Sequence, residues 1–139
     1  NEHYGLQPVL VGGTSPREVA AADSIRELAI HPPVSALGSG LRNLVGILEA
    51  SALVLSPDTG PLHMAVALGR PVISLIGYTD PRRTGPYRAF HDLIVDGYHD
   101  EGAAGPVTMK TRAGRMSGIS VTDVLEKIET WSERYRPKS

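Results

Sequence analysis

The stretch that most constrains the fold of this chain runs from Leu53 to Pro86. It opens with a short apolar run, Leu53–Ser56, which is typical of a strand buried on both faces. A tight turn follows at residues 57–60, and a helix then opens at Pro61, because proline is well tolerated in a first helical turn. A second apolar run, Val72–Ile76, comes directly after that helix. The stretch therefore predicts a strand, a tight turn, a helix and a second, parallel strand.

The turn between the first strand and the helix carries the candidate binding residues. In an open parallel α/β sheet, ligands bind beyond the carboxyl ends of the strands, and this turn lies at such an end. The residues placed there are Asp58, Thr59, Gly60 and His63. Gly60 allows another group to approach the backbone closely, and the amides that open a helix suit an anion such as a phosphate.

The rest of the sequence continues the alternation of short apolar runs with segments of helical spacing. Further strands are predicted at Pro8–Val11, Val34–Leu37 and Leu93–Val95. Further helices are predicted from Ser15 to about Ala29, from Leu41 to about Ser51 and from Ser120 through Trp131, and Asn1–Gly5 is expected to end another. This alternation predicts the α/β class, with a Rossmann-like, doubly wound parallel sheet and helices on both of its faces.

Three turns each follow a predicted strand and precede a predicted helix: Gly12–Gly13, Gly38–Gly40 and Asp58–Gly60. Because crossovers between parallel strands are right-handed, these turns are expected along one edge of the sheet, which would be the binding cleft. The segment Gly97–Gly118 differs, since it has no periodicity. A connection of about 20 structureless residues is unusual in a compact domain and is often functional or mobile. Its basic residues, Lys110, Arg112 and Arg115, make it cationic.

The composition excludes several classes of protein. The 139 residues suffice for one domain, and a net charge of −1 argues against a nucleic-acid-binding surface. The chain has no cysteine, which excludes disulfides and thiolate metal sites. No apolar run nears the roughly 20 residues of a transmembrane helix. Since the sequence starts with Asn1 rather than Met, we expect a piece of a longer protein.

The central stretch resembles glycosyltransferase family 9, which contains the ADP-heptose:lipopolysaccharide heptosyltransferases. The resemblance rests on the segments Asp58–Ala65, Ala67–Val72, Gly77, Thr79–Pro81 and Arg83–Tyr87. The family implies a GT-B fold, in which two Rossmann-like domains face each other across a cleft. Residues 1–139 match the C-terminal half of that fold, a single domain that binds the nucleotide-sugar donor.

The resemblance also implies what this half lacks. The N-terminal domain of the family holds the lipid-linked acceptor and the aspartate that acts as general base, so no catalytic residue is expected in this chain. The fragment alone is expected to have little or no transferase activity. Its last helix, which carries Trp131, is expected to dock against the missing domain, as helices at the end of GT-B proteins do.

At the sugar end of the donor, the resemblance assigns a role to each residue of the central turn. Asp58 matches the aspartate that holds the donor sugar, and Thr59 and Gly60 match the residues that meet the diphosphate. His63 matches a donor-site residue, although a histidine in a first helical turn also serves in packing or capping. Two cations, Arg82 and Arg83, follow near the same edge of the sheet. They either neutralise the diphosphate or are solvated surface charges.

At the nucleotide end, the implied contacts lie nearer the beginning of the chain. Glu18 matches the acidic residue that binds the ribose, but Ser15 three residues earlier gives Glu18 a sufficient structural role in a capping box. The turn that seats the base in the family matches Ser39, Gly40 and Leu41, for which a plain helix cap is the alternative.

The expected function is therefore the inverting transfer of heptose, or a related sugar, from an ADP-sugar to a lipopolysaccharide core acceptor. It would take place in the cytoplasm, at the inner face of the membrane, without a metal or other cofactor. A non-catalytic nucleotide-sugar-binding module and another Rossmann-like sugar-nucleotide enzyme, such as an epimerase, are the alternatives. The sequence lacks the Gly-x-Gly-x-x-Gly and Gly-x-Ser-x-Gly patterns that would indicate hydride transfer or a serine hydrolase.

Overall fold

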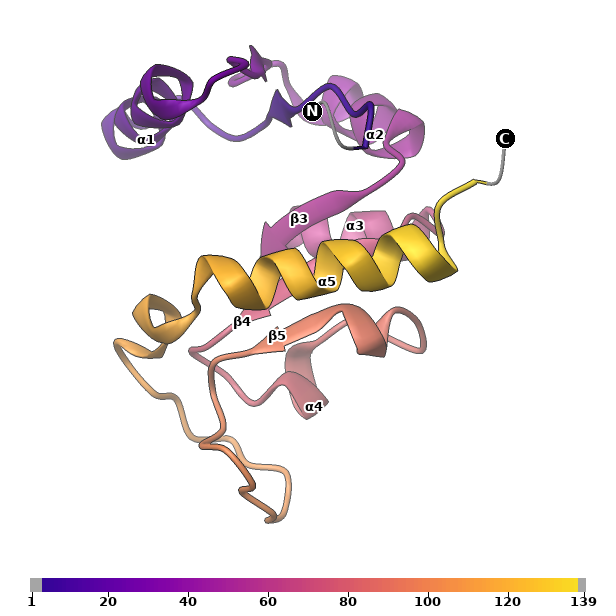
Figure 1. Cartoon of the computed structure of the whole chain (residues 1–139). Helices are drawn as coiled ribbons and strands as arrows, with labels where there is room; N and C mark the ends of the chain where they lie inside the picture. Colours follow the sequence, from indigo (N-terminus) through magenta and orange to yellow (C-terminus); the bar gives the residue numbers. More distant parts are fainter. Residues whose placement is uncertain (1–3, 138–139) are drawn as a thin grey trace. The chain divides into compact units, whose positions relative to one another are not determined.

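The computed structural model describes residues 4–137 of the chain (Figure 1). These residues form two compact units, one ending at Gly46 and the other beginning at Ile47, and each unit has its own parallel sheet. Tyr4 and Gly5 form a turn at the start of the described range. The rest of the helix that the sequence predicts before Gly5 lies outside the described residues.

The first unit contains two short strands and two helices. Its elements are β1 (Val9–Leu10), α1 (Pro16–Leu28), β2 (Val34–Ser35) and α2 (Leu41–Ala50), the last of which extends past Gly46. The strands are parallel, with Val9 opposite Val34 and Leu10 opposite Ser35. The turns that carry Gly12–Gly13 and Gly38–Gly40 follow these two strands, so they leave this small sheet at the same edge.

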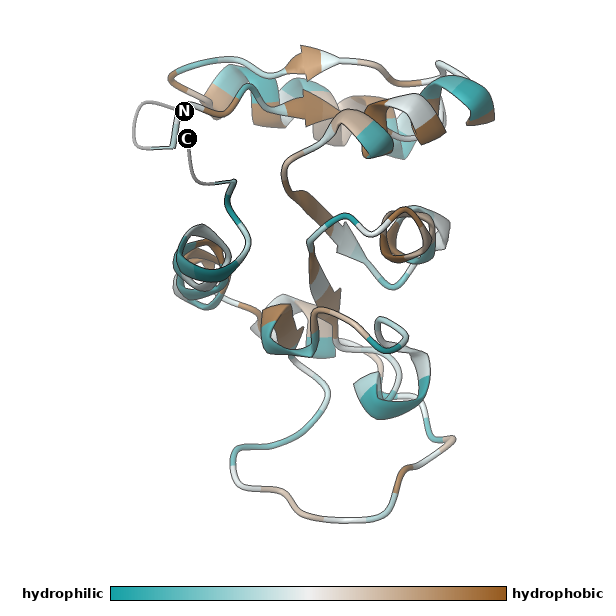
Figure 2. Cartoon of the chain, turned by 90° about the vertical axis from the view of Figure 1, so that its right-hand side faces the viewer, coloured by the Kyte–Doolittle hydropathy of each residue, from teal (hydrophilic) through white to brown (hydrophobic). Residues whose placement is uncertain are grey.

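The second unit has a three-stranded parallel sheet between two helices. Its strands are β3 (Val54–Pro57), β4 (Val72–Ile76) and β5 (Ile94–Asp96), in the order β3-β4-β5. Its helices are α3 (Gly60–Ala67), the one-turn α4 (Pro81–Thr84) and α5 (Val121–Arg134), with 3₁₀ turns at His91–Leu93 and Arg115–Gly118. Figures 1 and 2 show α3 and α5 on opposite faces of the sheet, and in Figure 2 the apolar strands lie between them.

The connection between β3 and β4 fixes the edge at which the candidate site lies. Helix α3 ends as the sequence predicts: Gly69 has a φ of +67°, and the Arg70 amide donates to the Ala65 carbonyl oxygen at 2.8 Å. The chain then enters β4 directly, with Pro57 opposite Leu75 in the register. Because the two strands are parallel and level, the turns that follow them emerge together at the carboxyl edge.

The α/β class, with parallel strands and helices on both faces, is confirmed, but the strands pair in two sheets rather than one. The expected alignment of all three turns along one continuous sheet is therefore wrong as stated. The physical reason lies in the length of the first two strands. β1 and β2 have two residues each, so their pairing ends after two residue pairs. Val34 is half exposed, because no further strand pairs with these two.

Helix α5 packs against its own unit through Trp131. This side chain is fully buried, and its indole Nε1 donates a hydrogen bond to the carbonyl oxygen of Ala52 at 3.1 Å. Beyond it, the carboxylate of Asp92 accepts hydrogen bonds from Tyr135 Oη at 2.8 Å and Arg134 Nη1 at 2.9 Å. The Trp131 ring therefore belongs to the core of the second unit, and the docking of this helix against the missing domain stays a prediction.

Replacing Trp131 by Ala should therefore destabilise the chain by about 3–5 kcal/mol, as is usual for a buried aromatic side chain. We expect urea unfolding followed by circular dichroism to show this loss. The matched control is Leu125→Ala on the same helix, whose side chain is half exposed and should cost far less. A Trp131→Ala loss no larger than that of the control would mean that α5 does not depend on this contact.

Candidate functional site

The candidate site is built around the carboxylate of Asp58, in the turn between β3 and α3. One of its oxygens, Oδ1, accepts a hydrogen bond from His63 Nε2 at 3.2 Å, and the other, Oδ2, accepts one from Thr79 Oγ1 at 3.0 Å. Since a carboxylate only accepts, the proton of the His63 ring lies on Nε2. About a quarter of the Asp58 side chain is exposed, so a ligand can still reach it.

Thr59 caps α3 with its backbone but not with its hydroxyl. In the described structure the Thr59 Oγ1 makes no capping bond; it lies 3.2 Å from Ser56 Oγ and donates to the carbonyl oxygen of Pro57 at 3.3 Å. The first turn of α3 is therefore not occupied by a side-chain cap. Pro61 contributes no amide hydrogen to this turn, so the donors that it offers to an anion come from its other residues.

Thr79 is a part of the site that sequence reasoning did not single out. It lies just beyond β4, at the same carboxyl edge as Asp58, and its hydroxyl is 2.7 Å from the hydroxyl of Thr84 in α4. The signal was present in the sequence, since the rule that selected the turn after β3 applies equally to the turn after β4. What the sequence does not show is that Thr79 points at Asp58.

Next to Thr79, the carboxylate of Asp80 is fully buried and carries four hydrogen bonds. Arg82 donates to Oδ1 from Nε at 3.0 Å, to Oδ2 from Nη2 at 2.8 Å and again to Oδ1 from its backbone amide at 3.0 Å. The Thr108 amide donates to Oδ2 at 3.1 Å. The Arg82 guanidinium, against the opposing effect of burial, holds the pKa of Asp80 far below its usual range.

Beyond Asp80, Arg82 also contacts residues 97–118, the long loop between β5 (Ile94–Asp96) and α5 (Val121–Arg134). Its Nη1 donates to the carbonyl oxygen of Gly105 at 2.7 Å, and its Nη2 donates to that of Pro106 at 3.2 Å. Its Nη2 also lies 3.1 Å from His99 Nε2. The two cations considered for the diphosphate thus differ: Arg82 is committed to protein groups, whereas the guanidinium of the exposed Arg83 makes no hydrogen bond or ion pair within the described residues.

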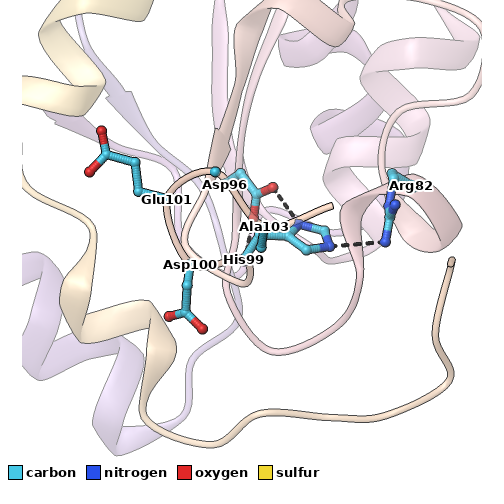
Figure 3. A pocket seen from close by; sticks show the side chains of 7 residues that line it. Arg82, Asp96, His99, Asp100, Glu101 and Ala103 are labelled. Carbon is cyan, nitrogen blue, oxygen red and sulfur yellow. Dashed lines mark hydrogen bonds and ion pairs between the residues drawn. The ribbon is translucent and has the colours of Figure 1, made fainter. Parts of the chain in front are cut away.

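A pocket of about 420 Å³ opens beside Arg82 (Figure 3). Because arginine only donates, His99 Nε2 accepts from Arg82, and its Nδ1 donates to Asp96 Oδ2 at 2.7 Å. Asp100 and Glu101 also line the pocket. Its one cationic side chain, Arg82, is already paired with Asp80, so the lining favours neutral or cationic groups over an anion such as a diphosphate.

The two arginines of the long loop, Arg112 and Arg115, are also held by protein groups. Arg112 Nη2 and Arg115 Nη2 donate to the carboxylate of Asp100 at 3.2 Å and 2.6 Å. Arg115 Nε donates to the Gly97 carbonyl oxygen at 3.0 Å. At Gly77 a Cβ atom would lie 2.8 Å from the backbone nitrogen of Met116, so the loop packs directly on the backbone that follows β4. Although it has little regular structure, the loop is anchored along its length.

Asp80→Asn should destabilise the chain by about 2 kcal/mol at pH 7, less than a fully buried ion pair would lose, because Arg82 is 42% exposed. The pKa of Asp80 is lower in the folded chain than in the unfolded one. Its contribution is therefore complete above about pH 4 and is lost as the pH falls further. Urea unfolding should show a smaller difference between the two proteins at pH 2.5 than at pH 7. An unchanged difference would contradict this.

In the first unit, Glu18 completes the capping box that the sequence predicts. Its Oε1 accepts from the Gly13 amide at 2.8 Å, and its Oε2 accepts from the Ser15 hydroxyl at 2.5 Å and the Ser15 amide at 3.4 Å. The hydrogen bond from the Ser15 hydroxyl, followed by that from Gly13, lowers the pKa of Glu18. The carboxylate is therefore fixed in place just beyond β1.

The turn after β2 presents the remaining predicted residues. The Ser39 carbonyl oxygen accepts a hydrogen bond from Asn43 Nδ2 at 2.8 Å, and Gly40 has a φ of +83°, which favours glycine. Leu41 opens α2 with 65% of its surface exposed, so its apolar side chain is accessible. The structure thus brings Asp58, Thr59, Gly60 and His63 together in the second unit, and places Glu18, Ser39, Gly40 and Leu41 in the first.

Residues 4–137 lack two further features, a metal-binding cluster and a membrane-spanning helix. No group of three or more histidine, cysteine, aspartate or glutamate side chains among them could hold a metal ion. None of the helices described is long and apolar enough to cross a membrane.

The model of glycosyltransferase family 9 (heptosyltransferase) matches residues 2–102, which is more than half of the chain. The chain belongs to glycosyltransferase family 9. All eight residues of the predicted site lie within the matched range. The long loop beyond residue 102 and helix α5 lie outside it, so the contacts of Thr108 and Arg115 are observations on this structure alone.

Two curated relatives are lipopolysaccharide heptosyltransferases. The lipopolysaccharide core heptosyltransferase OpsX of Haemophilus influenzae is 32% identical over 92 residues, which are 66% of this chain and 26% of that protein. Lipopolysaccharide heptosyltransferase 3 of Escherichia coli K12 is 35% identical over 81 residues, 57% of this chain and 24% of that protein. The chain thus spans about a quarter of the length of these relatives.

The fold also has a counterpart among solved structures. The crystal structure of the glycosyl transferase family 9 protein from Veillonella parvula is similar with a TM-score of 0.74 and 24% sequence identity. The similarity covers 92% of this chain and 37% of that one. At this identity the comparison concerns the fold alone, and it agrees with the α/β class.

Proposed function

We propose that residues 1–139 are the nucleotide-sugar-binding domain of a heptosyltransferase, the C-terminal half of a GT-B fold. The whole protein would transfer heptose from ADP-heptose to a lipopolysaccharide core acceptor at the cytoplasmic face of the inner membrane. The observation that carries the proposal is the Asp58 carboxylate, held at a sheet edge beside a helix N-terminus without a side-chain cap. Family membership and the two heptosyltransferase relatives support the same reaction.

Asp58 is suited to hold the hydroxyl groups of a sugar. An ionised carboxylate has about four positions at which it accepts hydrogen bonds, and His63 and Thr79 occupy one on each oxygen. The positions that remain can accept from two hydroxyl groups. Hydrogen bonds to a charged group are stronger than those between neutral groups, so this residue would contribute much of the affinity for the sugar.

The diphosphate of the donor would lie at the N-terminus of α3. Backbone amides there carry partial positive charge, and Gly60 lets an anion approach them closely. His63 is about half exposed on the first turn, with Nε2 already bonded to Asp58. Because Arg82 is committed to Asp80, negative charge that develops on the leaving diphosphate would be stabilised by these amides and by the exposed Arg83 rather than by Arg82.

For the nucleotide, the family resemblance assigns contacts to residues of the first unit. The apolar surface of Leu41 and the backbone of Ser39 and Gly40 would seat the base. Glu18 would bind the ribose through what remains of its accepting capacity, since three donors from Gly13 and Ser15 already use most of it. The contact from Glu18 is thus expected to be weaker than that from Asp58.

The mechanism follows from this division of tasks. The N-terminal domain of the whole protein would supply the general base and hold the acceptor. The reaction would invert the anomeric centre by direct displacement. This half would supply orientation of the donor and stabilisation of the leaving group. The proposal requires neither a metal nor another cofactor.

Calorimetric titration tests the proposal. The chain is titrated with ADP-heptose and, separately, with UDP- and GDP-sugars as alternative donors. We expect selective binding of ADP-heptose and a loss of at least about tenfold in affinity for Asp58→Ala, since one or more hydrogen bonds to a charged group disappear. Asp23→Ala, which removes an exposed carboxylate from α1, is the matched control. The proposal fails if the unsubstituted chain binds none of these sugars, or if Asp58→Ala binds as tightly as the control.

A further inference from the structure

The hydroxyl of Thr79 is one of the two protein groups that hold the Asp58 carboxylate. Its single proton has two possible acceptors, Asp58 Oδ2 at 3.0 Å and Thr84 Oγ1 at 2.7 Å. Because the carboxylate has no proton to donate, the Thr79 proton must point to Asp58. The proton between the two hydroxyls then comes from Thr84. The three side chains thus form a directed chain of hydrogen bonds from Thr84 through Thr79 to Asp58.

The backbone on either side of Thr79 is anchored independently of this chain. Before it, the Tyr78 carbonyl oxygen accepts a hydrogen bond from the Arg112 amide at 2.9 Å. After it, the buried Asp80 carboxylate accepts from Arg82 and from the Thr108 amide. Thr79 is therefore held between two contacts that both involve the long loop, and its hydroxyl has a fixed position relative to Asp58.

The two partners of Asp58 hold it from opposite oxygens. His63 binds Oδ1 from α3, the helix that begins two residues after Asp58, whereas Thr79 binds Oδ2 from the turn after β4. The His63 contact can move together with α3. The Thr79 contact ties the carboxylate to a separate, loop-anchored part of the sheet edge, and so fixes the plane of the carboxylate and the direction of its free positions.

We propose that Thr79 is a positioning residue for the donor sugar: its hydroxyl, fixed by Thr84 and by the loop contacts of its neighbours, orients Asp58 toward the sugar hydroxyls. The inference rests on the proposed function, since it takes Asp58 as the residue that holds the sugar. It also gives the long loop a role, because the loop contacts of Tyr78 and Asp80 place Thr79.

The test compares the affinity of the chain for ADP-heptose with its affinity for ADP, which has no sugar to orient. Thr79→Val keeps the shape of the side chain and removes the hydroxyl. We expect it to weaken ADP-heptose binding by about tenfold, the cost of one hydrogen bond to a charged group, and to leave ADP binding nearly unchanged. Thr79→Ser, which keeps the hydroxyl, should restore most of the affinity for ADP-heptose.

A double-mutant cycle separates positioning from a general disturbance of the fold. In the Asp58→Ala background, Thr79→Val should weaken ADP-heptose binding no further, because its hydroxyl no longer has a carboxylate to orient. Thr130→Val is the matched control, since Thr130 Oγ1 bonds the Glu126 carbonyl oxygen on the exposed face of α5. This control should bind both ligands as the unsubstituted chain does.

The outcomes distinguish the two proposals. If Asp58→Ala loses ADP-heptose while Thr79→Val retains it, the positioning role is wrong and the proposed function stands. If Thr79→Val weakens ADP and ADP-heptose equally, or weakens ADP-heptose equally with and without Asp58, its effect is structural and the inference is overturned. If the unsubstituted chain does not bind ADP-heptose, the proposed function fails and the inference fails with it.

Discussion

The structure at the carboxyl edge of the second sheet depends on the hydrogen bonds that one buried charge, the carboxylate of Asp80, requires. A carboxylate out of water is stable only when donors surround it, and Asp80 finds them in Arg82 and in the amide of Thr108. Thr108 lies in the long loop, so the same hydrogen bonds that satisfy Asp80 bring that loop against the turn after β4. Through this contact a segment with little regular structure becomes part of the scaffold of the candidate site.

The sequence predicted the local structure well and the long-range structure poorly. The capping box of Ser15 and Glu18 and the end of α3 at Gly69 each depend on neighbouring residues, and each is confirmed. The break between β3 and α3 is also present but is shorter than predicted, because Pro57 belongs to β3 and Gly60 to α3. The contact of Asp80 with Thr108 and the burial of Trp131 join residues far apart in the sequence, which periodicity cannot reveal. The division of the strands into two sheets was missed for the same reason.

The cations around the candidate site are paired to different extents. The two arginines of α4 differ in their availability, because Arg82 completes the buried pair with Asp80 while Arg83 stays exposed. Recognition of the donor would therefore rely on Asp58 and on backbone amides, which are fixed by the fold and need no long side chain to be ordered. Such a site has its groups in place before the ligand arrives, which limits the entropy lost on binding.

The tip of the long loop, residues 101–105, is exposed, although the Gly105 carbonyl oxygen at its end is bound by Arg82. The chain contains no cysteine, so a thiol introduced at Ala104 would be the single one in its sequence and would take a maleimide dye at that position alone. The dye would sit one residue away from the carbonyl that Arg82 holds. Its fluorescence would then report, in real time and without further labelling, on the surroundings of the loop tip beside this contact.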